Sequence, residues 1–381
     1  MKNNLKRRVW VEIDLGRISS NYRKISASVK PAAVLAVLKA NAYGLGVLPY
    51  ARALAKTDCS GFGVAEPFEA IQLREWQERE SGGNSMPVQI LSSILPDEIP
   101  PMVEAGVTLP VIDVRTAKLI SSAAARLHCA AKVHFKLDTG MGRLGIRAED
   151  APRVIREVKA LPNLDCEGIF SHCPMAYDPE NTFTEDQIDL FLAILRDAAK
   201  SGIRFRKVHI AASDAINNFP RCAKPPFTQV RTGINLHGSF DPFGRKALKV
   251  ESVLTLKTRI AQVRELPAGA TLGYGRTWCL SKKTRVATIS AGYADGLPLA
   301  LTNRGHVLVN GVPCPIIGRI SMDYTTVDVS HAPKAKPGDE VICLGEANGH
   351  RITPDDWAAI KGTHAYDIIC SFGNRVERVY I

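Results

Sequence analysis

Short apolar runs alternate with longer amphipathic stretches from residue 16 to about residue 235. Each apolar run has the length of a buried strand, and each amphipathic stretch carries apolar residues at helical spacing. The expected strands are Val34–Leu38, Gly61–Val64, Val88–Leu91, Leu109–Ile112, Ala131–Phe135, Cys166–Phe170, Lys207–Ile210 and Gln229–Val230. The expected helices include a stretch from about Leu48 and the segments Ile18–Ser28, Pro67–Glu78, Thr116–Leu127, Ala151–Lys159 and Glu185–Lys200.

Eight strands separated by helices over roughly 220 residues match a parallel (β/α)8 barrel in number and length. An open doubly wound sheet is the alternative. The segment Gly44-Leu45-Gly46 gives that alternative no support, because it does not complete a dinucleotide-binding glycine motif. The fold class is therefore predicted as α/β, with a cofactor-binding barrel over residues 14–245.

The pattern changes after about residue 246, where short β-rich runs with Gly and Pro turns replace the alternation. These runs are Ser252–Val263, Arg285–Ser290, His306–Val309, Cys314–Ile317, Thr325–Val329 and Glu340–Leu344. Only Pro354–Lys361 has the pattern of a helix. A second, mostly antiparallel β domain is therefore predicted for residues 246–381. Val9–Ile13 is strand-like and precedes the first barrel helix, so residues 1–13 are expected to join this second domain.

Composition narrows the class of protein. The 381 residues, of which 45% are hydrophobic, are enough for one large domain and a smaller one. The basic N-terminal segment is not followed by an apolar stretch, because Glu12 and Asp14 come soon after it, so no secretory signal is predicted. No window of about 18 uncharged apolar residues predicts a transmembrane helix. The nine cysteines are scattered and lack a Cys-x-x-Cys pair, which indicates reduced thiols in a cytoplasmic protein.

The formal net charge of +11 raises the question of an anionic partner. The basic residues are spread along the chain, with short clusters only at Lys6-Arg7-Arg8 and Lys282-Lys283, and no nucleic-acid-binding motif is present. Neither nucleic acid nor a membrane is therefore expected as a partner, whereas a small anionic substrate is compatible. The nine histidines include no His-x-His or His-Glu-x-x-His arrangement, so no metal site is predicted.

Lys39 is the most informative single residue, because it directly follows the first expected barrel strand. A lysine at the rim of a barrel is partly desolvated, which lowers the pKa of its ammonium group and leaves some neutral amine to react with a carbonyl cofactor. The plain alternative is a surface lysine whose stem packs on the barrel while its charge reaches water.

Further residues with ionisable or nucleophilic side chains follow other strands. Active sites of such barrels lie at the carboxyl ends of the strands. Each has a plain structural alternative: Ser213 as a helix cap, His172 as a buried core histidine, Arg231 as half of an ion pair. Agreement among several strand ends favours a shared site over these separate alternatives. The candidates are Lys39, Lys136 with Arg143 in the following loop, His172, Ser213 and Arg231.

The turn after the eighth strand contains Gly233, which lets backbone N–H groups approach an anion closely. Barrels often bind phosphate after strands seven and eight. A carbonyl-bearing, phosphorylated cofactor held by Lys39 fits this layout, and pyridoxal 5'-phosphate is the obvious candidate.

Five motifs give the chain a resemblance to the bacterial alanine racemases across essentially its whole length. They are Ala36–Gly44, Lys136–Gly145, Gly273–Gly275, Gly292–Gly296 and Ile317–Asp323. The first, second and last are long and specific. The resemblance implies a homodimer of barrel plus β-domain subunits in which each active site combines one barrel with the partner's β domain.

The resemblance also assigns residues to the cofactor. Lys39 would bind pyridoxal phosphate covalently, and Arg231 would contact its pyridine nitrogen. Lys136 resembles the lysine that is carbamylated in many members, where the resulting anion orients Arg143. The phosphate would be held by Tyr43, Ser213, the amides of Gly233 and Ile234, and, on a less specific match, Tyr366.

For the reaction, the resemblance implies two bases on opposite faces of the substrate Cα. Lys39 would serve one face and the partner subunit's Tyr274 the other, with His172 connecting Arg231 to that phenol. Arg231 would keep the pyridine nitrogen unprotonated, which suppresses transamination. Arg143 and the amide of the partner's Met322 would hold the substrate carboxylate. The family's product, D-alanine, supplies peptidoglycan.

Two positions depart from the family pattern. Leu299 stands where many relatives have an arginine near the substrate entrance, and His237 stands where a tyrosine is common. Both bear on the shape of the entrance and on substrate preference. The alternatives that remain are a racemase for another amino acid, a pyridoxal-phosphate carrier without catalysis, a group-III decarboxylase and, least supported, a barrel metal hydrolase.

Overall fold

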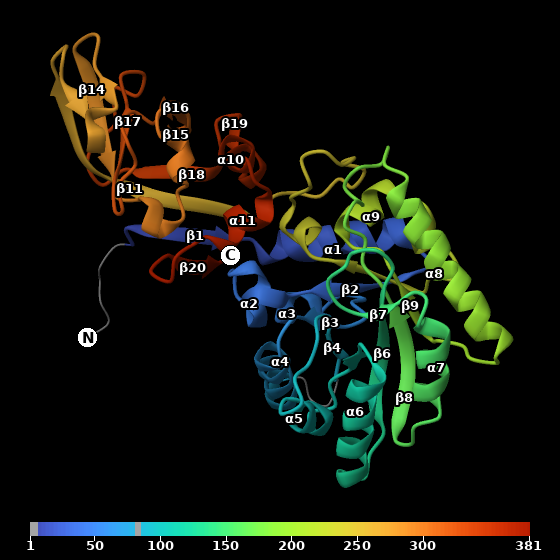
Figure 1. Ribbon diagram of the computed structural model, residues 1–381. Helices are drawn as coiled ribbons and strands as arrows, with labels where there is room; N and C mark the ends of the chain where they lie inside the picture. Colours follow the sequence, from blue (N-terminus) through green and yellow to red (C-terminus); the bar gives the residue numbers. More distant parts are fainter. Residues whose placement is uncertain (1–6, 81–84) are drawn as a thin grey trace.

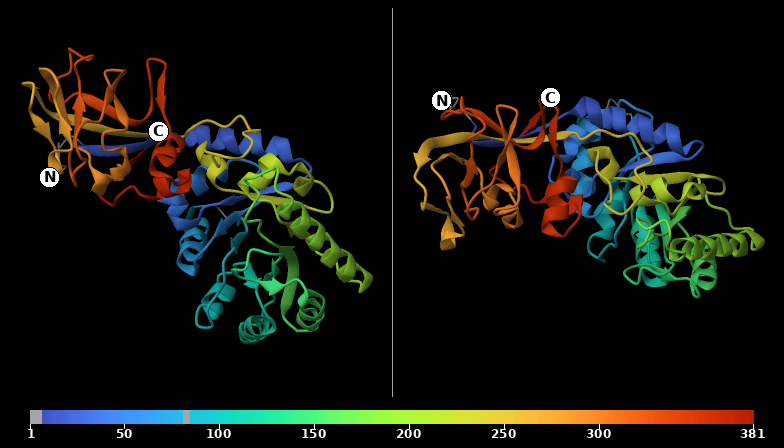
Figure 2. Two further views of the ribbon diagram at one scale, coloured as in Figure 1. Left: turned by 45° about the horizontal axis from the view of Figure 1, so that its top comes forward. Right: turned by 90° about the horizontal axis from the view of Figure 1, so that it is seen from above.

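The computed structural model describes residues 7–80 and 85–381. Two parts lie side by side (Figure 1): a barrel surrounded by helices, and a β-rich part drawn in orange and red. The further views in Figure 2 show the same arrangement, with the C-terminal helices between the two parts. Residues 1–6 of the predicted segment 1–13 lie outside the described residues.

The barrel consists of eight parallel strands, which confirms the predicted fold class and excludes the open doubly wound sheet. The order of pairing is β10-β2-β3-β4 and β5-β6-β8-β9. Ile90 N donates to Thr108 O at 3.0 Å and Thr228 N donates to Val208 O at 3.0 Å, which joins the two halves. The strands are β2 (Ala33–Val37), β3 (Phe62–Val64), β4 (Val88–Ile90), β5 (Leu109–Val111), β6 (Ala131–Asp138), β8 (Leu164–Phe170), β9 (Lys207–His209) and β10 (Gln229–Thr232), with the short β7 (Ile146–Arg147) on β6.

The barrel helices follow the predicted amphipathic stretches closely. The helix α1 begins after Asp14, whose carboxylate accepts a hydrogen bond from Arg17 N at 2.8 Å, and it buries residues three to four apart. Asp113 caps α6 in the same way. The helices are α1 (Leu15–Val29), α3 (Val47–Leu54), α4 (Pro67–Glu80), α5 (Ile99–Glu104), α6 (Val114–Arg126), α7 (Ala151–Lys159), α8 (Phe183–Lys200) and α9 (Ser213–Asn218), with the 3-10 turns η1 (Pro220–Ala223) and η2 (Ile234–His237).

The β-rich part is mainly antiparallel and is built around the long strand β11. The strand β1 lies between β11, with which it is antiparallel, and β20, with which it is parallel. The strands are β1 (Val9–Ile13), β11 (Leu254–Leu266), β12 (Thr271–Leu272), β13 (Trp278–Cys279), β14 (Thr284–Ile289), β15 (His306–Val309), β16 (Val312–Pro315), β17 (Thr325–Asp328), β18 (Glu340–Ala347), β19 (His350–Ile352) and β20 (Glu377–Tyr380). The division of the chain at residues 245 and 246 stays a prediction.

The expectation of a single helix in the second part was wrong. Besides α10 (Pro354–Lys361), the segment Ala365–Cys370 forms α11, and the turns η3 (Tyr274–Arg276), η4 (Tyr293–Asp295) and η5 (Leu299–Leu301) are 3-10 helical. The helix α11 is too short to show amphipathic periodicity in the sequence. Its start is fixed locally, because the ring of His364 accepts a hydrogen bond from Asp367 N.

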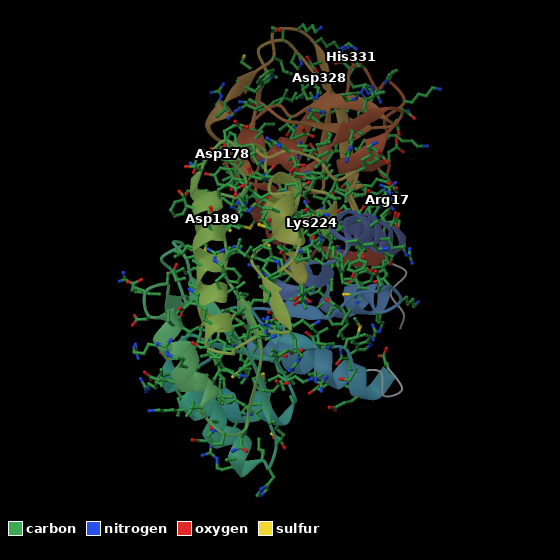
Figure 3. The ribbon with its side chains drawn as sticks, turned by 90° about the vertical axis from the view of Figure 1, so that its right-hand side faces the viewer. Arg17, Asp178, Asp189, Lys224, Asp328 and His331 are labelled. Atoms are coloured by element: carbon green, nitrogen blue, oxygen red, sulfur yellow. The ribbon has the colours of Figure 1, made fainter. Side chains whose placement is uncertain are left out.

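The connection between the two parts is polar at its surface. Arg17, labelled in Figure 3, stands at the start of α1, where the barrel meets the β-rich part. Its Nη1 donates to Ser252 O at 3.0 Å and its Nη2 lies 3.3 Å from Glu346 Oε1 on β18. One guanidinium therefore links the first barrel helix to the linker before β11 and to the sheet.

The segment Lys39–Tyr43, labelled α2, directly follows β2 and coils in the left-handed sense. The four residues Ala40 to Tyr43 have φ angles of 54°, 54°, 51° and 59°. Left-handed backbone costs roughly 1–2 kcal/mol for each residue that carries a Cβ. The sequence did not predict this run of strained non-glycine residues.

The C-terminal strand β20 stabilises that turn from the other part of the molecule. Arg378 Nε donates to Gly44 O at 3.0 Å, and Tyr380 Oη donates to Leu45 O at 3.0 Å. A Cβ at Gly46 would lie 2.1 Å from the Tyr380 hydroxyl, so the two segments are in close contact. Strain at Lys39–Tyr43 is thus offset by contacts that are distant in sequence.

One continuous hydrophobic core fills the barrel and the inner face of the main sheet. A smaller cluster of Leu272, Leu280, Val286 and Ile317 packs under β12 and β14. Within residues 7–80 and 85–381, no helix combines the length and the apolar character that crossing a bilayer requires.

Gly238 provides a test of how tightly the turn after the last barrel strand is packed. Its φ is +77°, and a Cβ there would lie 2.0 Å from the backbone oxygen of Glu251. Gly269 has a similar φ of +83° but no atom within 4 Å of its Cβ position. We expect Gly269→Ala to cost about 1 kcal/mol of unfolding free energy and Gly238→Ala about 3 kcal/mol or more, measured by urea denaturation. Equal costs would contradict the close packing of η2 against the linker.

Candidate active site

A cavity of about 560 Å³ opens at the carboxyl ends of the barrel strands. It is lined by side chains from the ends of several different strands, as expected for an active site of this fold. The lining residues that carry polar groups include Lys39, Tyr43, Ser92, Lys136, Arg143, His172, Ser213, Asp214, Arg231, Gly233 and Tyr366.

The six strand-end candidates from the sequence therefore meet in one cavity. Tyr43, Gly233 and Tyr366 line it as well, and Ile234 is fully buried directly after Gly233. Tyr274 and Met322 lie instead in the β-rich part, where 72% and 51% of their surface is exposed. One chain thus brings together every predicted site residue except these two.

Lys39 projects into this cavity from the end of β2 and is accessible through it. The surrounding walls desolvate its ammonium group, and Arg143 adds repulsion, so the pKa of Lys39 is lowered from its ordinary value. A lowered pKa increases the fraction of neutral amine, which is the form that attacks a carbonyl carbon.

Arg231 is the centre of the hydrogen-bond network under the cavity. Its side chain is buried, and burial lowers its pKa to about 10. Nη2 donates to Ser171 O at 2.8 Å and to Ile210 O at 3.0 Å, while Nη1 contacts His209 Nδ1 at 2.7 Å. These partners fix the plane of the guanidinium, which remains charged at neutral pH.

His172 lies at the edge of this network, with Nδ1 3.5 Å from Arg231 Nη2. Burial, followed by the repulsion of Arg231, lowers the pKa of His172 to about 3. The imidazole is therefore neutral at physiological pH. Its Nδ1 can accept from Arg231 while its other nitrogen carries a proton that it can donate.

Lys136 is 6% exposed and faces the same cavity from β6. Its Nζ donates to Leu91 O at 2.7 Å and lies 4.7 Å from the centre of the Phe170 ring. Burial, together with the charges of Arg231, Arg143 and Lys39, lowers the pKa of Lys136 to about 7. An amine of this pKa is neutral often enough at pH 7 to react with carbon dioxide or another small electrophile.

One end of the cavity is a tight polar cradle made by Tyr43, Ser213, Gly233 and Tyr366. Gly233 N donates to Ser213 Oγ at 3.1 Å, and the rings of Tyr43 and Tyr366 are 5.8 Å apart. A Cβ at Gly233 would lie 2.0 Å from the Tyr43 hydroxyl, so glycine is required there. The cradle presents hydroxyl and amide donors to an anion.

Sequence reasoning missed Asp214 and His209. Asp214 lines the cavity next to the cradle, and burial, followed by the proximity of Asp241, raises its pKa to about 6. His209 is fully buried below Arg231. The alternation of strand β9 places His209 inside the barrel, but no sequence signal identifies its contact with Arg231.

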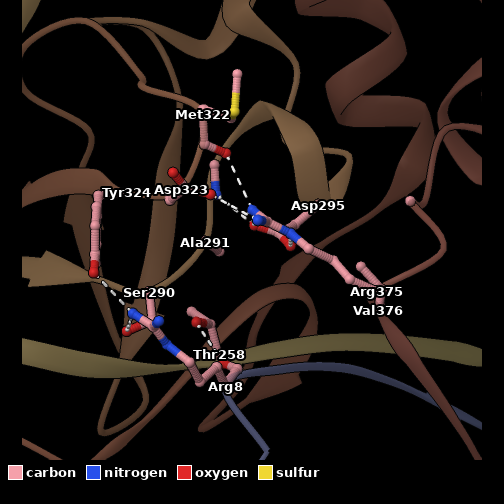
Figure 4. A network of polar contacts seen from close by, with 12 residues as sticks. Arg8, Thr258, Ser290, Ala291, Asp295, Met322, Asp323, Tyr324, Arg375 and Val376 are labelled. Carbon is pink, nitrogen blue, oxygen red and sulfur yellow. Dashed lines mark hydrogen bonds and ion pairs between the residues drawn. The ribbon is translucent and has the colours of Figure 1, made fainter.

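Arg375 stabilises the loop that carries Met322 (Figure 4). Its Nε and Nη2 bind the two oxygens of Asp295 at 2.7 and 3.0 Å, and its Nη1 binds Asp323 at 2.7 Å. Nη2 also contacts Met322 O at 3.4 Å. The Asp295 side chain is 2% exposed and accepts from Gly292 N at 3.0 Å. One guanidinium therefore joins two loops of the β-rich part, a contact that sequence spacing does not reveal.

Two known family models match successive stretches of the chain. Residues 13–241 match the model described as "Alanine racemase, N-terminal domain". Residues 253–380 match the model described as "Alanine racemase, C-terminal domain". Together these matches cover most of the chain.

Individual relatives extend over the full length. The alanine racemase of Halothermothrix orenii is 35% identical over 387 aligned positions, which cover 100% of this chain and 98% of that protein. The structure of alanine racemase from Streptomyces lavendulae is 32% identical, with a TM-score of 0.90 and coverage of 99% and 98%. A structure of alanine racemase from Bartonella henselae with covalently bound pyridoxal phosphate is 28% identical, with a TM-score of 0.87 and coverage of 99% and 100%.

The depressed pKa of Lys136 predicts a specific pH dependence of stability. Its pKa is about 7 in the folded protein and has the ordinary value of 10.5 in the unfolded chain. Between these values the unfolded chain binds the extra proton, so this lysine destabilises the fold fully below pH 7 and not at all above pH 10.5. In carbonate-free buffer, Lys136→Gln should therefore raise the melting temperature at pH 7, with a gain that shrinks toward pH 10.

Lys132→Gln is the matched control, because Lys132 is an exposed lysine on the same strand. Its difference from the parent protein should not vary with pH in this way. A gain for Lys136→Gln that is constant between pH 7 and pH 10 would show that the buried amine is protonated throughout.

Proposed function

The chain belongs to the alanine racemase family, and from this membership and the geometry of its pocket we propose how its residues interconvert L-alanine and D-alanine. The protein is an amino-acid racemase, an isomerase that uses pyridoxal phosphate. The observation that carries the assignment of residues is the cavity in which Lys39, Arg231 and the Gly233 cradle meet.

The residues of the cavity fit pyridoxal phosphate. Lys39, with its lowered pKa, would bind the aldehyde carbon. The cradle of Tyr43, Ser213, Gly233 and Tyr366, with the amide of Ile234, would hold the phosphate. A Cβ at Gly233 would collide with the Tyr43 hydroxyl, so glycine lets the backbone of the cradle approach that hydroxyl closely. When bound, the cofactor supplies an electron sink that acidifies the Cα–H bond of alanine.

Two groups on opposite faces of the substrate exchange the Cα proton. Lys39 Nζ would serve one face in its neutral form, which the walls of the cavity favour. The partner subunit's Tyr274 serves the opposite face. Tyr274 is 72% exposed in one subunit, as expected for a residue that completes the site of a second copy. The functional unit that we propose is therefore a homodimer with shared active sites.

Arg231 supplies a positive charge to the proposed reaction, and the neutral His172 supplies a hydrogen bond. The charge of Arg231 would keep a proton off the pyridine nitrogen of the bound cofactor, which would limit transamination. His172 is neutral because its pKa is about 3, so it can accept from Arg231 and donate toward the phenol oxygen of Tyr274. This chain of contacts stabilises the phenolate form of the base.

We further propose that Lys136 is carbamylated. Its amine has a pKa of about 7 and is buried beside Arg231 and Arg143, so converting it to a carbamate replaces a cation by an anion next to two cations. This change removes repulsion and orients Arg143. Arg143 and the amide of the partner's Met322 would then hold the carboxylate of alanine.

The two departures from the family pattern lie outside the proton-transfer groups. His237 is fully buried, its Nδ1 contacts Tyr50 Oη at 2.9 Å and its ring packs edge-on against Tyr43. Leu299 is 46% exposed in η5 of the β-rich part. We propose that His237 supports the phosphate cradle and that Leu299 lines the entrance without a charge.

In the family D-alanine supplies peptidoglycan, and we propose the same role here in the cytoplasm. All nine cysteines are free thiols, which fits a reducing compartment. The rival amino-acid racemase, carrier and decarboxylase assignments differ in product, so chiral chromatography of L-alanine incubated with the holoenzyme distinguishes them. Equal amounts of L-alanine and D-alanine at equilibrium are expected.

Tyr274→Phe tests the second base. Removing one phenolic oxygen from an exposed side chain should leave cofactor absorbance unchanged and slow racemisation by about 10²- to 10⁴-fold, the usual contribution of a general acid–base group. Tyr324→Phe is the control, because Tyr324 is also an exposed phenol of the β-rich part and has no proposed role in proton transfer. A rate for Tyr274→Phe near that of the control would remove Tyr274 from the mechanism.

Arg375→Lys tests the support of Met322. Lysine keeps the charge but cannot bind Asp295 and Asp323 together, so the Met322 loop should lose its fixed position. Because Met322 would contact the substrate carboxylate before and during the reaction, KM for alanine should rise about tenfold with little change in kcat. Arg285→Lys is the control, since Arg285 donates to the carbonyl oxygens of Pro333 and Ala335 at 2.7 and 2.6 Å elsewhere in the same part. An unchanged KM would contradict this role.

A further inference from the structure

A line of buried polar side chains runs through the barrel interior beneath the cavity. His209 and His134 are 0% and 3% exposed, and Gln89 is 3% exposed. Such positions of a barrel are normally filled by branched apolar residues. Buried polar groups are costly unless they are hydrogen-bonded, so their pairing indicates what the line does.

The contacts form a continuous path away from Arg231. Arg231 Nη1 lies 2.7 Å from His209 Nδ1, and His209 Nε2 lies 3.3 Å from His134 Nδ1. His134 Nδ1 also lies 3.0 Å from Gln89 Nε2. Beyond it, His134 Nε2 makes no hydrogen bond among the described residues and faces Glu167 Oε2 at 3.5 Å, longer than an ordinary hydrogen bond.

The ends of this path determine the direction of every hydrogen bond in it. A guanidinium can only donate, so with Arg231 in this position His209 Nδ1 accepts and its proton is on Nε2. That proton is donated to His134 Nδ1, which places the proton of His134 on Nε2, facing Glu167. An ionised carboxylate can only accept, so the far end requires the same direction as the near end.

Gly168 has no side chain, which leaves room for the ring of His134. A Cβ at Gly168 would lie 2.6 to 2.7 Å from three atoms of the His134 ring. No rearrangement of a flexible side chain relieves such a contact, because the ring is held on both sides. The location of His134 is therefore built into strand β8 as well as β6.

We propose that His134, together with Glu167, is a positioning pair for Arg231: it fixes the tautomer of His209 that presents a lone pair to the guanidinium. The tautomer of His209 does not depend on the proposed function. Its consequence, the placement of Arg231 against the pyridine nitrogen, rests on that function. In the opposite tautomer, His209 would direct an N–H at Arg231 Nη1 across 2.7 Å, and the guanidinium would have to move.

The charges around the path agree with this direction. Burial, followed by the charge of Arg231, lowers the pKa of His209 well below its ordinary value, so a doubly protonated ring is excluded at neutral pH. The contact with His134 is the main cause that lowers the pKa of Glu167. Lys207 and Arg206 also face Glu167, and Asp165 faces His134. The carboxylate therefore stays ionised and acts only as an acceptor.

The first measurement is nitrogen NMR of the folded, cofactor-free protein labelled with ¹⁵N-histidine, with His209→Gln and His134→Gln used to assign the signals. We expect His209 and His134 each to carry a single proton, on Nε2. A proton on Nδ1 of either ring would overturn the proposal. This readout does not depend on racemase activity, so it separates the inference from the proposed function.

The second measurement compares Glu167→Gln with Asp165→Asn in the holoenzyme. A glutamine can donate to His134 Nε2 as well as accept, so it permits the reversed direction of the hydrogen bonds. Asp165 lies on the same strand as Glu167, β8, and pairs with Arg206 at 2.6 Å. Glu167→Gln should add signals of the Nδ1-protonated tautomer and raise pyruvate release per racemisation turnover about tenfold.

Asp165→Asn should match the parent protein in both readouts. If the two variants behave alike, the carboxylate of Glu167 has only a structural role and the proposal fails. If the tautomers shift in Glu167→Gln while pyruvate release stays at the parent level, the positioning of Arg231 by this path is disproved, although alanine racemisation itself remains unaffected.

Discussion

A guanidinium buried without a carboxylate partner is the constraint on which the active site depends. Among residues 7–80 and 85–381, no acidic side chain forms an ion pair with Arg231, and its partners are carbonyl oxygens and imidazole nitrogens. A charge in such surroundings repels every proton that neighbouring groups could bind. Burial is the largest cause of the low pKa values of Lys136, His172 and His209, and the charge of Arg231 lowers each of them further.

Much of the fold and part of the site could be predicted from the sequence. The eight barrel strands differ from their predicted ranges by only a few residues at the ends, because buried parallel strands are short apolar runs between turns. Strand-end residues such as Lys136 and Ser213 were found by the same logic, since the fold gathers the carboxyl ends of its strands at one opening.

What the sequence did not reveal depends on contacts between distant segments. His134, Glu167 and His209 lie on three strands, and their contacts cannot be inferred from their spacing in the sequence. Arg375 binds Asp295 across 80 positions of sequence. The left-handed turn after Lys39 has no local signal either, because its alanine and asparagine residues do not favour that conformation strongly enough to predict it.

The dependence of that turn on strand β20 has a consequence for synthesis of the protein. Gly44 is held by Arg378, and Leu45 by Tyr380, and these partners are separated by 334 and 335 positions. At translation rates of roughly 5–20 residues per second, a nascent chain exposes Lys39 some 20–70 s before its support is made. Until β20 has been made and has docked, the turn that carries Lys39 lacks the hydrogen bonds of Arg378 and Tyr380.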